Sequence, residues 1–466
     1  MSVKTYDFII GYENKVRELE SVCLLKYELE KRGYSVLIFQ EFDQRYDDVY
    51  THLYHAKVLI LSCGYEDHFV EAFCRRFITF DKLVNWQWEQ IFNDELEDDP
   101  DSYLNVHGEI CRQAVQLSWG EYNVDRLVRI MDIPRDRVYK TGNISMDFLR
   151  PEFNSFYKTR EEVLAEYGIN PQYKVAILIG VFQDAFTSEE ELTKRKEETG
   201  YDYHDIAREN RMRFDIEMDW IYRALQEDSN LFFIYRPHPG EEIDRCPEDV
   251  RQLVENIKSK TGRFIVNQDY TVRQWFKVAD KVYTGYSTTM VDAYYAKVAC
   301  RLLAPAGIPM SEEVRLFDGI KETQTYEAFK ESLSEDGFVS PLKEEHIDGY
   351  FGVTDRPSYI RIIEALEQVL SDDKYVIDTT KMLDKLNKQI EKDMSERSLG
   401  KRIKLRLWRY NWFYNMYWCL MSLPIKHSYF ERQKEYKERI EQYKRGYIAQ
   451  AGEVRNITGK IKRCIG

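Results

Sequence analysis

Several patterns that would assign this chain to a common class of protein are missing from it. There is no GxxxxGK(S/T) loop and no GxGxxG turn, which argues against P-loop kinases and NAD-dependent enzymes. The eight cysteines form no CxxC pair, so we expect reduced, mostly buried thiols and no zinc site. No DxD-type motif follows a strand in the first half, and the acidic stretch 95–101 is interpreted as a solvated loop. These absences predict a protein that uses neither a metal nor an organic cofactor.

Long hydrophobic runs are missing too. No stretch approaches the roughly 18 apolar residues of a membrane-spanning helix, and the first residues enter a strand without an apolar leader. We therefore expect a cytoplasmic protein. The chain of 466 residues is 43 % hydrophobic and 32 % charged, which is typical of a globular protein with more than one domain.

Acidic residues are scarce in the last part of the chain, although the net charge of the whole is −13. Residues 401–466 hold 16 Lys and Arg against 5 Glu, a net charge of +11, so the first 400 residues carry −24. Residues 401–420 are basic first and aromatic afterwards, a pattern typical of a helix that lies in a bilayer interface. This predicts peripheral binding to the anionic inner face of the plasma membrane. The alternative is that the segment packs on the chain's own core or on a second subunit.

Strands and helices alternate along the first 370 residues, which predicts an α/β protein with parallel, doubly wound sheets. A break follows residues 142–151, and the alternation then restarts. We therefore expect two Rossmann-like domains that face a cleft (the GT-B arrangement), at 1–155 and 156–372, and a helical extension at 373–466. The strands are expected at 6–10, 35–39, 57–61, 82–85, 175–179, 231–235, 263–266, 281–284 and 300–303.

One candidate site is the sequence Arg236-Pro237-His238-Pro239, which follows the apolar strand 231–235. The two prolines fix the turn and hold His238 at the carboxyl end of the sheet, where ligands of such sheets bind. An imidazole in this place can donate to a phosphate or protonate a departing nucleotide, and Arg236 can pair with phosphate or with acidic neighbours.

A second candidate site begins at Gly285, directly after the strand 281–284. Gly285 is expected to permit a tight turn, and Ser287, Thr288 and Thr289 open a helix. Backbone N–H groups at a helix start, together with these hydroxyls, form a site for an anion. Asp292 lies one turn later and is expected to accept hydrogen bonds from ribose hydroxyls. Taken alone, this motif is also an ordinary helix cap.

These two motifs, about 50 residues apart, resemble the HP and Ser-Ser/Thr motifs of bacterial GT-B enzymes that use CMP-activated sugars, such as sialyltransferases and Kdo transferases. The likeness extends over roughly residues 5–310 to bacterial surface carbohydrate (capsule and lipopolysaccharide) biosynthesis proteins. It implies that His238, Ser287 and Thr288 contact the donor phosphate and that the N-terminal half binds the acceptor. One departure is Asp292, where many such enzymes have Glu. The further matches are Glu13, Arg17-Glu18-Leu19, Gln87-Trp88-Glu89-Gln90, Gly142-Asn143, Asp147 and Leu149-Arg150-Pro151.

The segment 284–292 resembles CDP-glycerol glycerophosphotransferases nearly as well. The nucleotide is therefore expected to be cytidine-based, while a CMP-sugar and a CDP-alcohol both remain open as donors. The acceptor would be a glycan or a lipid-linked glycan. A non-catalytic assembly protein with an inherited GT-B shell and an epimerase are further alternatives.

Three acids are candidates for work on the acceptor or the sugar centre, since a carboxylate can serve as base or as nucleophile. Glu89 follows the strand 82–85 beside Trp86 and Trp88, which could stack on a sugar or could pack a core. Asp184 follows the strand 175–179, and its alternative role is to cap a helix. Glu13 follows the first strand and is expected to lie near a bound substrate or to cap the next helix. Glu241 and Glu242, near His238, are interpreted as solvated loop acids, and the alternative is that they tune the pKa of His238.

Overall fold

The chain forms two compact units, each with its own sheet. The first unit combines residues 1–92, 96–148 and 349–466, and the second combines 93–95 and 149–348. The structure is a computed structural model. It describes residues 3–13, 15–40, 54–75, 78–92, 99–102, 105–238, 241, 246–308, 314–407, 416 and 449–466.

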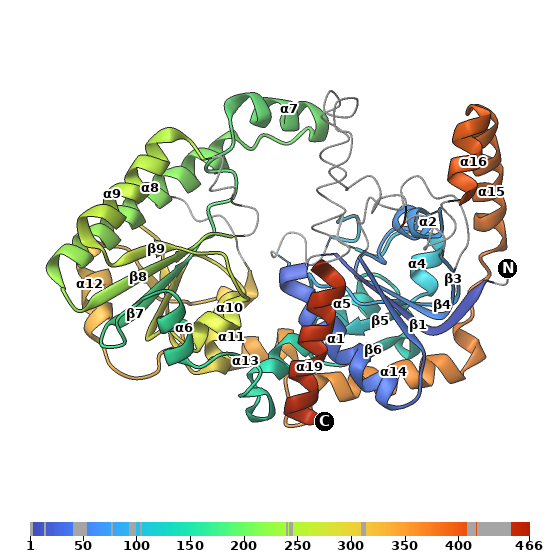
Figure 1. Ribbon diagram of the computed structural model, residues 1–466, viewed down its shortest axis with the longest axis horizontal. Helices are drawn as coiled ribbons and strands as arrows, with labels where there is room; N and C mark the ends of the chain where they lie inside the picture. Colours follow the sequence, from blue (N-terminus) through green and yellow to red (C-terminus); the bar gives the residue numbers. More distant parts are fainter. Residues whose placement is uncertain are drawn as a thin grey trace. The chain divides into compact units, whose positions relative to one another are not determined.

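The sheet of the first unit has six parallel strands in the order β2-β1-β3-β4-β5-β6 (Figure 1). The chain leaves β1 for one neighbour, β2, and returns on its other side as β3, so the winding direction reverses between β1 and β3. Ligands of such sheets bind at the carboxyl ends of the strands beside this switch point. The strands are β1 (Lys4–Tyr12), β2 (Val36–Gln40), β3 (Tyr54–Leu61), β4 (Ile78–Asn85), β5 (Val115–Ser118) and β6 (Val138–Lys140).

Helices cover this sheet, and their ends follow ordinary capping chemistry. Gly33, in the left-handed region with φ 92°, ends the first of them at the predicted place. An apolar core that includes Leu59, Phe73 and Leu83 lies between the sheet and these helices. The helices of eight or more residues are α1 (Lys15–Lys31), α2 (Asp67–Arg75), α5 (Glu121–Arg129), α14 (Ser358–Ser371), α15 (Thr380–Ser395), α16 (Leu399–Leu407) and α19 (Ala449–Ile465), and α4 (Glu109–Gln113) is shorter.

The chain returns to the first unit after residue 348, which differs from the predicted division at 155 and 372. The buried carboxylate of Asp147 accepts hydrogen bonds from the backbone N–H groups of Ser358 (3.0 Å) and Tyr359 (2.8 Å) at the start of α14. At the other end, Lys82 Nζ donates to the carbonyls of Val369 and Leu370. Side chains far away in the sequence thus stabilise both ends of α14, which helix periodicity alone does not reveal.

The last helix, α19, packs on α1 of the same unit. Ile461 is fully buried, Lys15 Nζ lies 2.5 Å from the carboxylate of Glu453, and Lys31 Nζ donates to the carbonyl of Ile465. Residues 449–466 therefore pack on the chain's own core, which is the alternative to membrane binding. Most of the basic and aromatic stretch lies outside the described residues, namely 408–415 and 417–448.

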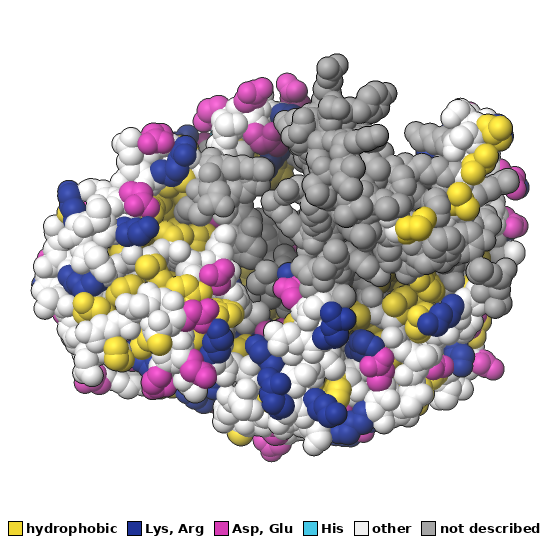
Figure 2. All heavy atoms as spheres, viewed as in Figure 1, with side chains coloured by type: hydrophobic (Ala, Val, Ile, Leu, Met, Phe, Trp, Pro, Cys, Tyr) yellow, Lys and Arg dark blue, Asp and Glu magenta, His cyan; other side chains and the backbone are white. Residues whose placement is uncertain are grey.

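The short helix α16 carries an exposed apolar stripe at helical spacing. Leu399, Ile403 and Leu407 are 66, 51 and 37 % exposed, and hydrophobic side chains gather on this helix at the upper right of Figure 2. In the part of the chain that the structure describes, no helix has the length and hydropathy needed to cross a bilayer.

The sheet of the second unit is also parallel and has the order β12-β11-β10-β7-β8-β9. Numbered within the unit and read from the β9 edge, this is 3-2-1-4-5-6, the order of a Rossmann fold, with the switch point between β7 and β10. The strands are β7 (Lys174–Ile179), β8 (Leu231–Arg236), β9 (Phe264–Val266), β10 (Lys281–Thr284), β11 (Ala299–Leu303) and β12 (Glu322–Thr323).

An apolar core with Phe214, Trp220, Phe233 and Phe329 lies between this sheet and its helices. Glycine or threonine caps bound several of these helices, for example Gly262 after α9, in the left-handed region with φ 63°. The helices are α6 (Arg160–Glu166), α7 (Glu189–Thr199), α8 (His204–Glu227), α9 (Glu248–Thr261), α10 (Val272–Phe276), α11 (Thr289–Ala296), α12 (Tyr326–Ser334) and α13 (Glu344–Phe351).

The predicted fold class is confirmed: two Rossmann-like α/β units with helical structure in the C-terminal extension. Each strand expected from the sequence is present. The strands β5, β6 and β12 were not predicted, and they have four residues or fewer. Of the seven cysteines in the described part of the chain, none forms a disulfide and all but Cys464 are buried. The expected cleft between the two units stays a prediction.

Candidate functional site

Hydroxyl side chains gather at the switch point of the second unit, where β10 ends and α11 begins. Ser287 Oγ lies 2.8 Å from Thr289 Oγ1 and accepts a hydrogen bond from the backbone N–H of Thr289. Thr288 occupies the N-cap position without a side-chain cap. The backbone N–H groups of Met290 and Val291 donate to the carbonyls of Ser287 and Thr288, so the hydroxyls are the donors that this turn offers to an anion. The motif thus lies at the start of a helix directly after a strand, as the sequence predicted. Its contact with phosphate stays a prediction.

The Arg236-Pro237-His238 turn lies at the end of β8, the strand next to β7. Arg236 is buried, and its Nη1 and Nη2 donate to the carbonyls of Asp269 (2.9 Å) and Tyr270 (2.6 Å). Burial lowers the pKa of Arg236 to about 10, so the guanidinium stays charged at neutral pH. Arg236 therefore holds the loop after β9, and a role in phosphate binding stays a prediction.

His238 is half-buried, and its backbone is fixed from two sides. The carbonyl of His238 accepts from the backbone N–H of Glu241 (2.8 Å) and from Gln268 Nε2 (3.2 Å). This turn is therefore tied to the loop after β9 as well as to the residues that follow it. Pro239 and Glu242 lie outside the described residues.

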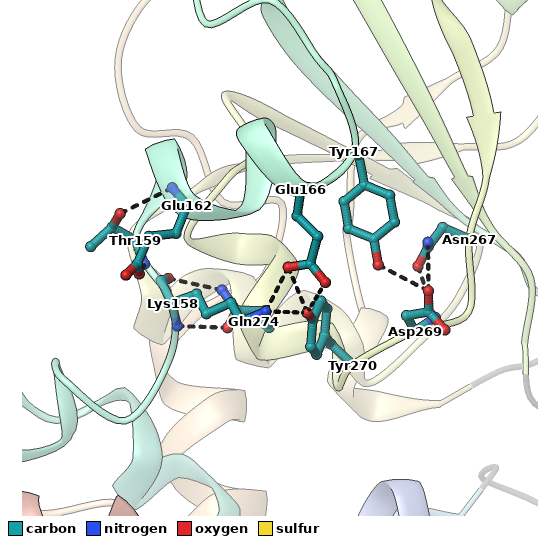
Figure 3. A network of polar contacts seen from close by, with 9 residues as sticks. All are labelled: Lys158, Thr159, Glu162, Glu166, Tyr167, Asn267, Asp269, Tyr270 and Gln274. Atoms are coloured by element: carbon teal, nitrogen blue, oxygen red, sulfur yellow. Dashed lines mark hydrogen bonds and ion pairs between the residues drawn. The ribbon is translucent and has the colours of Figure 1, made fainter.

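A polar network holds the loop after β9 in place (Figure 3). The phenol of Tyr167 donates to Asp269 Oδ2 (2.9 Å), and the phenol of Tyr270 donates to the carboxylate of Glu166 (2.7 Å). Lys158 Nζ contacts both Glu166 (2.5 Å) and the phenol oxygen of Tyr270 (2.6 Å). Tyr270 has φ 61°, a conformation that costs free energy in a non-glycine residue, and the network together with Arg236 maintains it.

A groove of about 640 Å³ opens beside this loop, between α9 and the end of β9. Gln268, which donates to the carbonyl of His238, is part of its wall. The volume falls within the range of small-molecule sites. Its lining residues are Tyr167, Cys246, Arg251, Val254, Glu255, Lys258, Ile265, Val266, Asn267, Gln268 and Asp269.

Glu241 is buried beneath the His238 turn, so the interpretation of Glu241 as a solvated loop acid is wrong. Its Oε1 accepts from the backbone N–H of Phe182 (2.7 Å), and its Oε2 accepts from the phenol of Tyr235 (2.5 Å). A side chain at Gly180 would place its Cβ 2.5 Å from Oε2, which explains the glycine. Burial raises the pKa of Glu241 to about 7. The carboxylate thereby joins the ends of β7 and β8.

A buried arginine lies behind the other glycine of the switch point. Arg213 and Glu217 of α8 are 6 and 0 % exposed, and Arg213 Nη2 lies 3.8 Å from Glu217 Oε1. A Cβ at Gly285 would lie 2.3 Å from Arg213 Nη2, so Gly285 makes room for the guanidinium. Gly285 does not have a positive φ, so its backbone conformation does not require glycine. This pair was not predicted from the sequence. The available signal was two charged residues on the apolar stripe of α8.

Asp184 and Asp292 have ion-pair partners in the structure. Asp184, five residues after the end of β7, has φ 63°, and its Oδ1 accepts a hydrogen bond from Arg195 Nη1 (2.6 Å). Non-glycine residues in this conformation cluster at functional sites. Asp292 is buried, and its Oδ1 accepts a hydrogen bond from Arg273 Nε (2.8 Å). This ion pair explains the presence of a carboxylate at this position without a bound ribose. The catalytic role of Asp184 and ribose binding by Asp292 stay predictions.

The switch point of the first unit brings Glu13 and Glu89 together around an arginine. Arg17 Nη1 lies 3.0 Å from Glu89 Oε1, and Arg17 Nη2 lies 3.4 Å from Glu13 Oε2. The side chains of Glu13, Arg17 and Glu89 are 43, 38 and 56 % exposed. Cys63, after β3, lies 3.8 Å from the Glu13 carboxylate. Arg17 was not among the predicted site residues, although its position four residues after Glu13 at the start of α1 was a signal.

The tryptophans beside Glu89 are buried. Trp86 and Trp88 are 0 and 6 % exposed, and their ring centroids are 4.9 Å apart. This burial favours core packing, the alternative to sugar stacking. Gln90 is buried as well, and its Nε2 donates to the carbonyls of Gln87 and Leu117. In this segment Glu89 is thus the exposed residue among buried neighbours.

The comparisons with known proteins give likenesses of structure alone. No protein-family model matches the chain, and no significantly similar curated protein is found. A putative UDP-N-acetylglucosamine 2-epimerase from Listeria monocytogenes is 10 % identical, with a TM-score of 0.44 over 80 % of this chain and 97 % of that one. The UDP complex of S. aureus MnaA is 11 % identical, with a TM-score of 0.46 over 79 and 97 %. The wall teichoic acid polymerase TagF is 11 % identical, with a TM-score of 0.46 over 79 and 89 %.

Proposed function

We propose that this chain is a GT-B-type transferase that uses a cytidine-activated donor, namely a CMP-linked sugar such as Kdo or a sialic-acid-like sugar. It transfers the sugar to a glycan or lipid-linked acceptor in surface polysaccharide biosynthesis. The observation that carries the proposal is the position of the two motifs. The His238 turn and the hydroxyl-rich start of α11 follow β8 and β10, the two strands that flank β7 in one Rossmann sheet. Such strand ends bind nucleotide phosphates in folds of this kind.

The chemistry assigned to this site needs no metal. The hydroxyls of Ser287, Thr288 and Thr289 would stabilise the charge that develops on the departing phosphate. His238 would donate a proton or a hydrogen bond to the leaving nucleotide. The nucleoside would occupy the neighbouring groove, where Asn267, Gln268 and Asp269 offer amide and carboxylate groups.

The substitution His238→Ala tests this proposal. We expect transfer to fall by at least about 100-fold, because a positioned acid typically contributes that much or more, with the melting temperature unchanged. The matched control is His204→Ala, since His204 is a second-unit histidine that hydrogen-bonds Asp202 at the start of α8. Full activity of the His238 variant with the true donor would refute the assignment.

A CDP-alcohol such as CDP-glycerol is the second candidate donor, because the segment 284–292 resembles the corresponding motif of those transferases. Thermal-shift measurements with cytidine, uridine and guanosine nucleotides, followed by calorimetry with CMP and CDP, would separate the candidates. A protein that binds none of them would favour the non-catalytic alternative.

We also propose that α16 helps to dock the chain on an anionic membrane surface. Leu399, Ile403 and Leu407 form an exposed apolar stripe within a strongly basic segment (Figure 2). Cosedimentation of the full chain with phosphatidylglycerol vesicles should fall strongly in a Leu399→Glu/Ile403→Glu variant and at high salt. Val376→Glu, which changes another exposed apolar residue of the first unit, is the control. Equal binding of all three proteins would contradict the proposal.

A further inference from the structure

The guanidinium of Arg213 lies directly behind the turn that the proposed function assigns to phosphate. Its Nη2 approaches Gly285 so closely that a Cβ there would lie 2.3 Å away, and Gly285 is two residues before Ser287. The side chain of Val181, after β7, makes a similar approach to Gly285, at 2.4 Å from that Cβ. Arg213 is therefore packed between the ends of β7 and β10, the two strands of the switch point.

Some of the N–H donors of Arg213 make no hydrogen bond. Nη1 donates to Asn210 Oδ1 (3.2 Å), whereas Nε and Nη2 are buried and have no hydrogen-bond acceptor. The ring of Phe182 covers the guanidinium at 5.6 Å from its centroid. A buried charged group with unused donors is costly unless another charge compensates it.

The carboxylates near Arg213 compensate this charge incompletely. Glu217 is 3.8 Å away, beyond hydrogen-bond distance, and neither of its oxygens has a donor. Burial raises the pKa of Glu217 to about 8, so at neutral pH this group is largely protonated. Glu241 accepts its hydrogen bonds from the N–H of Phe182 and the phenol of Tyr235, and it interacts with Arg213 through its charge without being hydrogen-bonded to it. A positive charge thus remains at the switch point without an anion in contact.

We propose that Arg213 is an electrostatic residue of the donor site, a fixed buried positive charge that attracts the donor's phosphate to the turn 285–289 without contacting it. This inference rests on the proposed function, because it assumes that the turn binds phosphate. Charges interact strongly where protein excludes water, and a preorganised charge costs no reorganisation when the ligand arrives. The class of ligand is a nucleotide with one or two phosphates, and the dependence on Arg213 should rise with phosphate charge.

Calorimetric titration of the full chain with cytidine, CMP and CDP tests this inference. The informative variant is Arg213→Gln/Glu217→Gln, which replaces both members of the buried pair by neutral amides. Its matched control is Glu217→Gln, which keeps Arg213. Relative to the control, we expect the double variant to bind CMP about tenfold more weakly and CDP more weakly still, with cytidine affinity unchanged.

Two results would overturn the inference. One is equal CMP and CDP affinity in the double variant and the control. The other is an equal loss for cytidine, CMP and CDP, which would mean that Arg213 acts only on the shape of the site. A melting temperature and a circular dichroism spectrum of each variant exclude loss of the fold as the cause.

Titrations of the same proteins with UDP, GDP and pyrophosphate separate this inference from the proposed cytidine specificity. Wild-type binding of UDP or GDP but not of CDP would contradict the cytidine donor, and a tenfold Arg213 effect on that nucleotide would still support the anion site. If the wild-type chain binds none of these anions, the inference is wrong, because there is then no phosphate site for Arg213 to serve.

Discussion

The two units treat charge differently at corresponding places in their sheets. At the switch point of the first unit, Glu13, Arg17 and Glu89 form ion pairs that are about half exposed. At the switch point of the second unit, Arg213 and Glu217 lie inside the protein, and the hydroxyls of Ser287 and Thr289 lie in the turn in front of them. The first arrangement suits direct contact between a side chain and a substrate. The second suits a ligand that brings its own charge.

The difference also has an energetic side. Exposed ion pairs contribute little to stability, about 0–1 kcal/mol each, so the first unit can reposition or replace them at small cost. Buried charges carry a desolvation penalty that only good partners offset. Among the glycines that follow the switch-point strands, Gly180 and Gly285 lie against buried charged side chains, whereas Gly64, after β3 of the first unit, lies against the amide of Asn85.

The largest expected effect concerns the exposed acid of the first unit. We predict that Glu89→Gln lowers the transfer rate by about 100-fold or more, because the amide cannot serve as base or nucleophile, with little change in stability. Glu121→Gln is a suitable control, since Glu121 is also an exposed first-unit acid with a cationic partner, Lys140. Steady-state kinetics and a melting curve of both variants would decide the matter. An active Glu89 variant would transfer the assignment to Glu13 or Asp184.

The sequence predicted such sites because strand ends are visible in it. Apolar runs located β1, β4 and β10, and the residues that follow these strands, Glu13, Glu89 and Ser287, lie at the carboxyl ends of the sheets as expected. Pairing in a parallel sheet brings the carboxyl ends of distant strands together, so a correct list of strands already indicates which loops are neighbours.

The remaining features depend on contacts between distant segments. The burial of Glu241 follows from Gly180 and the N–H of Phe182, about 60 residues earlier, and no local pattern encodes it. Charged residues on α8 such as Arg213 are read as surface residues because most charged side chains are. The return of α14 to the first unit depends on Asp147, more than 200 residues before the helix it caps.

A second prediction compares the two glycines at the strand ends. We expect Gly180→Ala to destabilise the second unit by about 1–3 kcal/mol, because its Cβ would lie 2.5 Å from the Glu241 carboxylate, which two hydrogen bonds hold in place. Gly64→Ala should cost less, since its Cβ would lie 3.2 Å from Asn85 Oδ1. Urea unfolding of both variants measures the difference. Equal losses would mean that the second unit adapts to the extra methyl group as readily as the first.

A third prediction is a pH dependence of stability that arises from the buried carboxylates of the second unit. The folded protein raises the pKa of Glu217 to about 8 and that of Glu241 to about 7, mainly through burial, whereas the unfolded chain has ordinary values near 4.5. Between these limits the folded state binds more protons than the unfolded state. The free energy of unfolding therefore falls as pH rises from about 5 to 8, by at most about 1.4 kcal/mol per pH unit for each group.

Removal of one of these groups shows whether the buried carboxylates cause the dependence. Glu217→Gln cannot ionise, so its stability should fall less steeply between pH 5 and 8 than that of the wild-type chain. Hydrogen exchange of peptides from α8 and β8 follows the second unit separately from the first. It is measured at pH 5 and at pH 8 and corrected for the intrinsic exchange rate. Parallel curves for the two proteins would place the ionisation of Glu217 below this pH range, and Arg213 would then have a charged partner in the unliganded protein.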